Sequence, residues 1–364
     1  MSVAVIPGDG IGPEIVAQAA NVLRAVRPDL TLTFALAGAA ALRAGEAPLP
    51  QSTRRVCGSS DAILFGSVGD PEFDSAPFPQ RPEAALFSLR SDFRLFANLR
   101  PVRVYDGLER ASTLHAHLIR GLDLILVREL TGGIYFGRPK ERAVNSDGVE
   151  CAVDTMVYSK PEIERIVHVG FELARKRRKH LVSVDKQNIL ETSRLWRETV
   201  NAMAASYPDV GLEHLLVDNA AMQLVRRPAD FDVIVTENMF GDILSDEAAI
   251  LTGSIGNLPS ASLAAGKPGW TFGMYEPIGG TAPDIAGRGI ANPVGAILSA
   301  ALLLRYSLND VQSAQRVEAA VADVFAAGLH TADLAAAGGS VVSTEQFGAA
   351  VVGRLDGRGR SAHG

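Results

Sequence analysis

The chain has 364 residues, of which 47% are hydrophobic and 21% are charged, and its formal net charge is -6 at pH 7. This length suffices for two domains of ordinary size, and the acidic balance argues against a partner that is a nucleic acid. The chain has two cysteines, which suits a reducing compartment. The sequence shows neither a signal segment nor an apolar run near the roughly 20 residues that span a bilayer. We therefore expect a soluble, cytoplasmic protein without a membrane partner.

The N-terminal segment predicts a strand, a glycine-rich turn and a helix. Val3–Ile6 is apolar, the sequence PGDGIG follows at 7–12, and Pro13 suits the first turn of a helix. The turn has the composition of a phosphate loop, but its spacing is not G-x-G-x-x-G, so a plain tight turn is an equal interpretation. A strand at 62–65 leads into a Gly-, Pro- and Asp-rich loop at 66–82, and loops of that length are often functional.

Three arginines, Arg90, Arg100 and Arg128, lie close to the ends of the next predicted elements. Most arginines are solvated surface residues. A guanidinium can also hold a carboxylate through two parallel hydrogen bonds. Position alone leaves open whether these arginines are surface charges or a clamp for a small dicarboxylate.

The middle and the last part of the chain each add a clear element. Apolar residues alternate through 149–157 after the turn Asn145–Gly148, which predicts an extended ribbon or hairpin arm. A long helix is expected after Pro161. Asn292 is expected to cap a further helix with Pro293 at its first position.

Three buried strands in the second half of the chain end in polar residues. The strand at 181–184 leads into Lys186, the strand at 215–217 leads into Asp218, and the strand at 233–235 precedes Asp242. Ligands bind at strand ends in open α/β sheets. These residues therefore predict a cation-assisted site with an amine beside it.

Asp242 and Asp246 follow Gly241, where we expect the chain to break and a helix to begin at about Asp242. Residues four apart project from one face of a helix. Two anions side by side repel each other, and a hard divalent cation relieves that repulsion. An acidic first turn also suits the helix dipole without any ligand. The polar residues at the other two strand ends favour the metal interpretation, in which Asp242 and Asp246 supply half of the ligands.

Seven motifs occur in the order in which they occur in a known family. They are IPGDGIGPE, PEAALFSLR, LFANLRP, VRELTGGIYFG, VSVDKQN, FGDILSDEAA and EPIGGTAPDIAG. From about Val3 to Leu355 the chain resembles the isocitrate/isopropylmalate family of β-decarboxylating dehydrogenases, and it is most similar to the members that act on 3-isopropylmalate. The resemblance implies the isopropylmalate dehydrogenase-like two-domain α/β fold, which is not a Rossmann fold, with the active site in an interdomain cleft.

The resemblance also implies a domain organisation. Residues 1–99 and 252–364 would form a discontinuous, cofactor-binding first domain. Residues 100–251 would form the central domain with the metal-binding and catalytic residues. An arm near 142–158 would pair with the second subunit of a homodimer whose subunits share their active sites.

The activity implied is the NAD-dependent oxidative decarboxylation of 3-isopropylmalate to 2-oxoisocaproate and CO2 in leucine biosynthesis, with Mg2+ or Mn2+. Family members for D-malate or tartrate are the alternative, because they share nearly every other motif. Leu86 and Phe87 offer an apolar wall for an isopropyl group, whereas isocitrate needs polar or cationic groups for its third carboxylate. Phe87 itself replaces a commoner leucine.

The resemblance assigns roles to single residues. Lys186, from the other subunit, would act as the base, and Tyr135 would protonate the enolate carbon. The metal ligands would be Asp242, Asp246 and the other subunit's Asp218. The substrate would be contacted by Glu83, Leu86, Phe87, Arg90, Arg100, Arg128 and Asp218. The cofactor would be contacted by Ile11, Asp74, Glu276, Pro277, Gly279, Gly280, Ala282, Asp284, Ile285 and Asn292.

The type of cofactor follows from Asp284, which matches the family position that binds the adenosine ribose. A carboxylate there would repel a 2'-phosphate, so NAD is expected rather than NADP. Gly279 stands where many relatives have histidine, so one adenine contact is expected to be absent.

Three other classes of protein fit less well. A phosphoryl-transfer enzyme would normally carry G-x-x-x-x-G-K-[ST], which is absent from the sequence. A regulatory subunit of this family would lack metal-binding or base residues, all of which are present here. A two-domain binding protein would be secreted with a signal segment.

Overall fold

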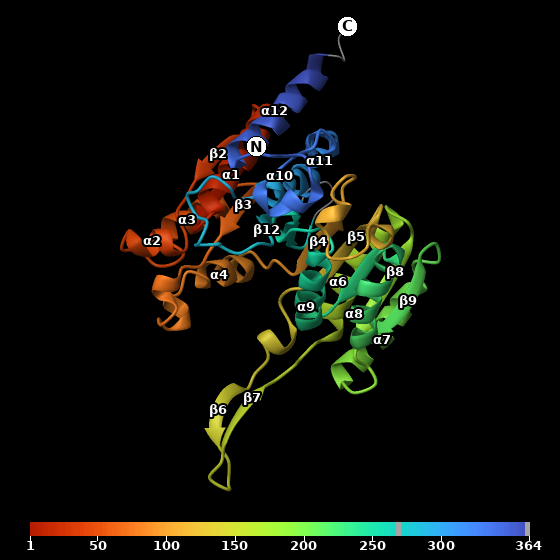
Figure 1. Cartoon of the computed structure of the whole chain (residues 1–364). Coiled ribbons are helices and arrows are strands. Elements are labelled where there is room, and N and C mark those ends of the chain that lie inside the picture. Colours follow the sequence, from red (N-terminus) through yellow and green to blue (C-terminus); the bar gives the residue numbers. More distant parts are fainter. Residues whose placement is uncertain (267–270, 361–364) are drawn as a thin grey trace. The chain divides into compact units, whose positions relative to one another are not determined.

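The computed structural model describes residues 1–266 and 271–360 and separates into two compact units (Figure 1). Unit 1 contains Met1–Leu95, Arg103–Gly121 and the chain from Ala249 onward, and unit 2 contains Phe96–Val102 and Leu122–Ala248. Arg103–Gly121, which the sequence analysis placed in the central domain, clusters with unit 1. Within the described ranges, no helix is both long and apolar enough to cross a membrane.

The strands of unit 1 form a mostly parallel sheet. The parallel strands lie in the order β2-β1-β3-β12, and β11 pairs with β12 in antiparallel fashion. Every residue of β3, β11 and β12 is buried, as expected for strands covered on both faces. The bounds are β1 (Ser2–Gly8), β2 (Thr31–Phe34), β3 (Ala62–Ser67), β11 (Pro259–Leu263), β12 (Gly273–Pro277), and the short pair β13 (Leu329–His330) and β14 (Ser340–Val341).

Helix α10 (Val294–Tyr306) is the central helix of unit 1. It is buried on all sides from Val294 to Leu304 because α1, α11, β11 and β12 pack around it. The other helices are α1 (Gly12–Val26), α2 (Ala39–Arg43), α3 (Gln51–Gly58), α4 (Ala84–Asp92), α5 (Ala116–Ile119), α11 (Val311–Ala326) and α12 (Thr344–Arg360). Short 3-10 turns are η1 (Pro71–Phe73), η2 (Phe78–Gln80), η3 (Glu109–Ala111), η6 (Ile255–Asn257) and η7 (Ala332–Ala337).

The strands of unit 2 lie in the order β4-β5-β10-β8-β9, and β5, β10, β8 and β9 run parallel. Their bounds are β4 (Ala97–Arg103), β5 (Asp123–Glu129), β8 (His180–Asp185), β9 (Gly211–Leu216) and β10 (Val233–Thr236). Thr236 pairs with Arg128 on one side and with Val184 on the other. The residues that follow these strands therefore emerge at one edge of the sheet.

The helices of unit 2 connect these strands. They are α6 (Lys160–Arg175), α7 (Glu191–Ala204), α8 (Val217–Arg226) and α9 (Asn238–Ile250), with the 3-10 turns η4 (Gly133–Tyr135) and η5 (Pro228–Asp230). The helix predicted after Pro161 is α6. It begins with a capping box between Ser159 and Glu162 and packs on β5, β8 and β10.

A two-stranded ribbon extends from unit 2 (Figure 1). Strands β6 (Lys140–Val144) and β7 (Glu150–Asp154) pair in antiparallel fashion, and all their residues are exposed. The Asn145 side chain accepts hydrogen bonds from the backbone N–H groups of Asp147 and Val149, at 3.0 and 2.9 Å. The ribbon predicted from the alternating residues is confirmed.

Candidate active site

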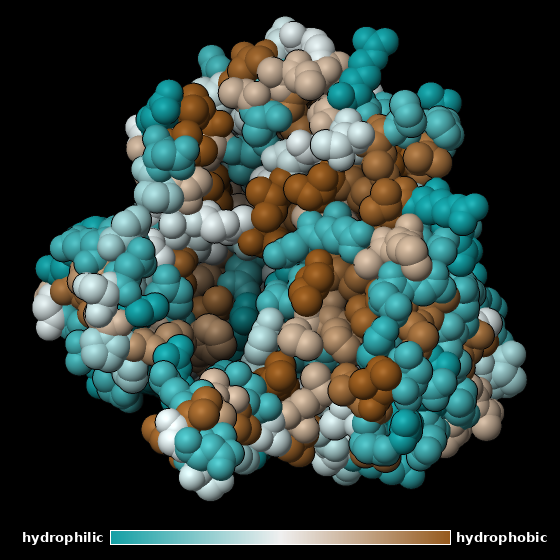
Figure 2. All heavy atoms as spheres, turned by 60° about the horizontal axis from the view of Figure 1, so that its bottom comes forward, coloured by the Kyte–Doolittle hydropathy of each residue, from teal (hydrophilic) through white to brown (hydrophobic). Residues whose placement is uncertain are grey.

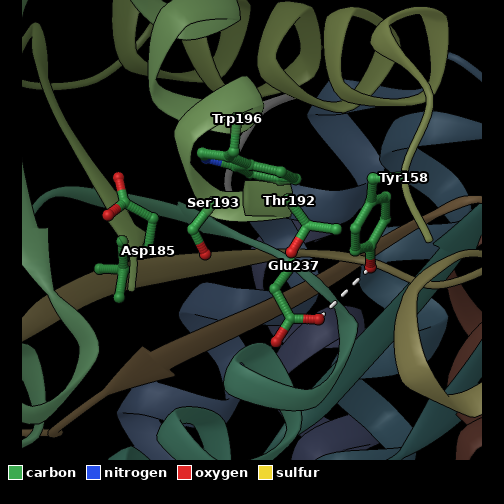
Figure 3. Close-up of a pocket in the computed structure, with 7 residues that line it drawn as sticks. Tyr158, Asp185, Thr192, Ser193, Trp196 and Glu237 are labelled. Carbon is green, nitrogen blue, oxygen red and sulfur yellow. Dashed lines mark hydrogen bonds between the residues drawn. The ribbon is translucent and has the colours of Figure 1, made fainter. Parts of the chain in front are cut away.

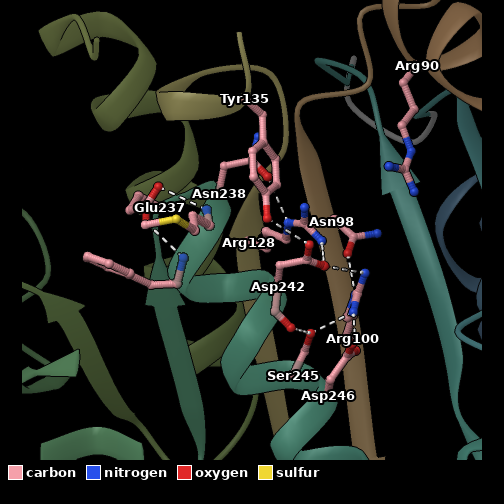
Figure 4. A network of polar contacts seen from close by, with 12 residues as sticks. Arg90, Asn98, Arg100, Arg128, Tyr135, Glu237, Asn238, Asp242, Ser245 and Asp246 are labelled. Atoms are coloured by element: carbon pink, nitrogen blue, oxygen red, sulfur yellow. Dashed lines mark hydrogen bonds and ion pairs between the residues drawn. The ribbon is translucent and has the colours of Figure 1, made fainter. Parts of the chain in front are cut away.

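Asp242, in α9, accepts hydrogen bonds from two residues of unit 2 and forms an ion pair with a third (Figure 4). Arg128 donates from Nη1 to Oδ1 in a short contact, and the Tyr135 hydroxyl donates to Oδ2 at 3.1 Å. Arg100 Nη2 lies 3.7 Å from Oδ1. The side chains of Arg100 and Arg128 are only 10% and 5% exposed, whereas that of Asp242 is 36% exposed. Two nearly buried cations thus face one accessible carboxylate.

Asp246 lies one turn further along α9 and is reached by the same arginine. Arg100 donates from Nη1 to Asp246 Oδ1 at 3.2 Å and to Ser245 Oγ at 2.6 Å, and from Nε to Asn98 Oδ1 at 2.8 Å. The Asp246 side chain is 63% exposed. As the four-residue spacing predicted, both carboxylates lie on one face of the helix.

The start of α9 differs from the prediction. The helix begins at Asn238, so Gly241 lies inside it and does not break the chain. Glu237 accepts hydrogen bonds from the N–H groups of Met239 and Phe240, at 3.0 and 2.8 Å, and so caps the first turn. A Cβ at Gly241 would lie 2.7 Å from Arg128 Cγ. The glycine therefore serves close packing of α9 against the arginine.

Tyr135 ends the turn η4, and its hydroxyl is a suitable proton donor. Burial, and then the negative charge of Asp242, raises the pKa of Tyr135 above its usual value. The Arg128 guanidinium lies 5.9 Å from the centre of the Tyr135 ring. The hydroxyl therefore stays protonated at neutral pH.

Lys186 and Asp218 form a second polar group in unit 2. Lys186 Nζ lies 2.7 Å from Asp218 Oδ1, and this hydrogen bond lowers the pKa of Asp218. Among the described residues, no three His, Cys, Asp or Glu side chains come together as a metal site. Asp218 of one chain therefore does not join that chain's own Asp242 and Asp246.

The two aspartates on α9 have side chains of the type that binds a hard divalent cation. Asp242 and Asp246 offer carboxylate oxygens, the donors that Mg2+ and Mn2+ prefer. Mg2+ usually takes one or two carboxylates and completes its shell with water and substrate oxygens. For such a cation, the pair in one chain would supply only part of the ligand shell.

The predicted substrate residues of unit 1 lie on or beside α4. Arg90 Nη2 donates to Glu276 Oε1 at 2.8 Å, which joins a predicted substrate residue to a predicted cofactor residue. Leu86 packs against the core cluster that contains Ala85 and Leu89. Phe87 is 39% exposed and meets Phe78 edge to face, with ring centres 5.4 Å apart. Glu83 is the N-cap residue of α4.

Most of the predicted cofactor residues of unit 1 lie at the end of β12 or on the loop that follows it. The Ile11 N–H donates to the Thr281 carbonyl at 2.9 Å, which brings the PGDGIG turn against this loop. Asp284 is exposed on the loop, and Asp74 is exposed at the end of η1. The loop also contains Gly279, Gly280, Ala282 and Ile285. An exposed carboxylate on a glycine-rich loop has the chemistry needed to accept hydrogen bonds from the ribose hydroxyl groups of a dinucleotide.

Asn292 is also a structural residue. Its Nδ2 donates to Asn257 Oδ1 and to Asp333 Oδ2, both at 2.9 Å, and its Oδ1 accepts from the Val294 N–H at 3.0 Å. The Asn292 side chain therefore accepts from the first N–H of α10, but the N-cap residue is Pro293, one position later than the sequence predicted. The contacts occupy the side chain that was predicted to meet the cofactor.

Comparison with known proteins identifies the family. The family model described as isocitrate/isopropylmalate dehydrogenase matches residues 2–351. The chain belongs to the isocitrate/isopropylmalate dehydrogenase family. The family and the fold predicted from the seven motifs are confirmed.

Two relatives and one solved structure show the extent of the likeness within the isocitrate/isopropylmalate dehydrogenase family. The 3-isopropylmalate dehydrogenase of Bordetella avium is 57% identical over 357 residues, which cover 97% of this chain and 99% of that protein. The protein of the same name from Albidiferax ferrireducens is 55% identical and is covered completely, with 98% of this chain. An isocitrate dehydrogenase structure from Methylococcus capsulatus has a TM-score of 0.85 at 33% identity, covering 97% of this chain and 99% of that one.

The sequence analysis missed polar residues that support the arginines in this member of the family. Asn98 and Ser245 contact Arg100, and Asn238 accepts a hydrogen bond from Arg128 Nε at 2.9 Å. The sequence contained a signal for Asn238, because polar residues that follow buried strands are candidate site residues. Asn238 follows β10 in the same way as Lys186 follows β8. For Asn98 the signal was its position two residues before Arg100 on one strand.

A small pocket beside this network is structural (Figure 3). Its labelled lining residues are Tyr158, Asp185, Thr192, Ser193, Trp196 and Glu237. Asp185 accepts hydrogen bonds from Arg197 at 2.8 and 3.0 Å, and Glu237 caps α9 and contacts the Tyr158 hydroxyl at 3.4 Å. Asp185 therefore joins β8 to α7, and Glu237 joins the start of α9 to Tyr158.

Proposed function

We propose that this protein is a cytoplasmic enzyme of leucine biosynthesis that oxidatively decarboxylates 3-isopropylmalate, using NAD, to 2-oxoisocaproate and CO2. The observation that carries the proposal is Asp242, held on α9 by Arg100, Arg128 and Tyr135. These groups are the cations, carboxylate and acid that a 2-hydroxy dicarboxylate needs for this reaction. The names of the relatives at 55% and 57% identity support 3-isopropylmalate as the substrate.

The chain's own residues would bind the substrate and transfer its protons. Arg100 and Arg128 hold the carboxylates, and Arg90 and Glu83 are proposed as further substrate ligands. Lys186 takes the proton of the 2-hydroxyl. After CO2 has left, Tyr135 donates its proton to the enolate carbon, which suits a hydroxyl whose pKa is raised. Fixing the substrate between these groups lowers the barrier by removing orientational freedom.

Two bound groups would supply the remaining chemistry. The nicotinamide of NAD would accept the hydride, and Mg2+ or Mn2+ would polarise the substrate oxygen. Asp242 and Asp246 are proposed as the metal ligands of one chain. The loop of unit 1 with Asp284, together with Ile11 and Asp74, is proposed to hold the cofactor.

We also propose that the protein is a homodimer whose subunits share their sites. Large apolar residues are exposed on unit 2: Ile189 is 67% exposed, Met222 on α8 61% and Ile243 on α9 58%. Hydrophobic residues also reach the surface at several places on the face shown in Figure 2. Contact with a second subunit would bury these apolar side chains. The exposed ribbon β6-β7 would pair with its copy.

A direct assay tests the proposed function. The formation of NADH from 3-isopropylmalate with Mg2+ is compared with that from D-malate, tartrate and isocitrate, and with NADPH formation from NADP. We expect the highest kcat/KM for 3-isopropylmalate with NAD. A higher value for D-malate or tartrate would reject the proposed substrate and keep the reaction class.

Leu86→Ala is expected to lower kcat/KM for 3-isopropylmalate about thirtyfold, because burying the three carbons of an isopropyl group is worth about 2 kcal/mol. D-malate lacks this group, so its kcat/KM should change far less. Val56→Ala is the matched control, since Val56 packs against the same core cluster as Leu86. Equal losses for both substrates in Leu86→Ala would remove Leu86 as the specificity residue.

Asp284→Arg is expected to weaken the use of NAD about tenfold and to improve that of NADP, because it replaces a ribose acceptor by a cation that attracts a 2'-phosphate. KM values for both cofactors measure the change. Glu46→Arg makes the same charge reversal at another exposed position of unit 1 and should leave both values unchanged. If NADP is used as poorly as before, Asp284 does not select the cofactor.

A further inference from the structure

Asn238, the first residue of α9, connects two parts of the candidate active site (Figure 4). It is 1% exposed. Its Oδ1 accepts from Arg128 Nε at 2.9 Å, and its Nδ2 donates to the Gly132 carbonyl at 3.0 Å. An arginine N–H can only donate and a carbonyl can only accept, so the orientation of the amide is fixed by its neighbours.

Arg128 itself donates to Asp242, and so does Tyr135, three residues after Gly132. The Nη1 group of Arg128 donates to Asp242, and a guanidinium is planar, so a fixed Nε fixes the direction of Nη1. Gly132 immediately precedes η4, which ends at Tyr135, whose hydroxyl donates to Asp242. One amide therefore contacts both the arginine and the segment that leads to the tyrosine.

The surroundings of Asn238 are themselves rigid. Its backbone N–H donates to the Tyr158 hydroxyl at 3.0 Å, and Tyr158 is 6% exposed. The N–H of Gly132 donates to the fully buried Glu129 at 2.7 Å. The peptide groups on both sides of Gly132 are therefore held, by Glu129 before it and by Asn238 after it.

We propose that Asn238 is a positioning residue of the reaction proposed above, acting through Arg128 on substrate binding and through Gly132 on Tyr135. The neutral amide of Asn238 offers an acceptor to the arginine and a donor to the carbonyl at once, on two separate atoms. Its effect on turnover rests on the proposed function. Its coupling to Arg128 rests on the contacts alone.

The first test compares Asn238→Ala with Thr236→Val. Thr236 is fully buried two residues earlier and donates to the Val184 carbonyl at 2.9 Å, so Thr236→Val also removes one buried hydrogen bond. Asn238→Ala should lower kcat/KM for 3-isopropylmalate about 100-fold, as misplaced catalytic groups do. Thr236→Val should stay within about threefold of the wild type. Equal losses in the two variants would overturn the proposal.

Two further variants separate the two contacts of the amide. Asn238→Asp keeps the acceptor for Arg128 and loses the donor for Gly132, so kcat should fall with little change in KM. Arg128→Lys removes Nε and with it the contact to the amide. Adding Asn238→Ala to Arg128→Lys should therefore raise KM by less than about a further threefold. Unchanged kcat in Asn238→Asp, or full additivity of the KM changes with Arg128→Lys, would overturn the proposal.

Unfolding by denaturant gives a readout that needs no turnover. The free energy of unfolding is measured for the wild type, Asn238→Ala, Arg128→Lys and the double variant. If the contact is formed, the loss in the double variant should differ from the sum of the losses in the two single variants. An inactive wild type with such coupling would reject the proposed function and keep the contact. An active wild type with additive losses would reject the role of Asn238.

Discussion

Asp242→Asn is expected to lower the turnover of 3-isopropylmalate about 1,000-fold, which corresponds to about 4 kcal/mol in the barrier. The substitution keeps the size of the side chain and one oxygen. It removes the negative charge that Arg100 and Arg128 face and one of the proposed metal ligands. Both the geometry of the arginines and the binding of the cation should therefore change.

Two measurements besides activity distinguish these effects. Mg2+ or Mn2+ should raise the melting temperature of the wild type, because a ligand that binds only the folded state stabilises it, and this rise should be absent in Asp242→Asn. The pKa of Tyr135 should fall in the variant but stay raised by burial, since burial is its larger cause and the charge of Asp242 the next.

Asp209→Asn is the matched control for Asp242→Asn. Asp209 accepts from Arg175 Nη2 at 2.8 Å, so this variant also breaks an aspartate–arginine pair in unit 2, outside the candidate site. Its activity and metal response should equal those of the wild type, because an exposed pair of this kind contributes little. A metal response that survives in Asp242→Asn would show that Asp242 is not a ligand.

The sequence predicted the parts of the site that follow from periodicity. A spacing of four placed Asp242 and Asp246 on one face of a helix, and Arg100 contacts both in the structure. This spacing is a local rule that needs no knowledge of tertiary packing. Position alone left the role of Arg128 open, and the structure places it beside the start of α9 because β5 and β10 are neighbours.

The sequence could not predict what depends on packing. Glycine is a poor helix former, so a break at Gly241 was the natural expectation. The structure keeps the helix because Glu237 caps it and because Arg128 passes where a Cβ would lie. The pair Arg90–Glu276 joins residues 186 positions apart, and no local pattern indicates such a contact.

Mixing Lys186→Ala chains with Asp242→Asn chains is expected to restore activity that neither variant has alone. If Lys186 and Asp218 of one chain serve the Asp242 group of its partner, each mixed dimer contains one complete site. Random reassociation makes about half of the dimers mixed, so about a quarter of the wild-type activity should return. The physical reason is that Lys186 pairs with Asp218 at 2.7 Å while no third acidic ligand joins Asp242 and Asp246 within the described part of one chain.

A second mixture is the control for this complementation. Tyr135→Phe and Asp242→Asn chains should restore nothing, because Tyr135 contacts Asp242 of its own chain at 3.1 Å and both belong to the same site. Mixed dimers are purified through two different affinity tags, so that their formation is established before activity is measured. Inactive mixed dimers of Lys186→Ala with Asp242→Asn would mean that the subunits do not share a site, because each chain would then need its own lysine.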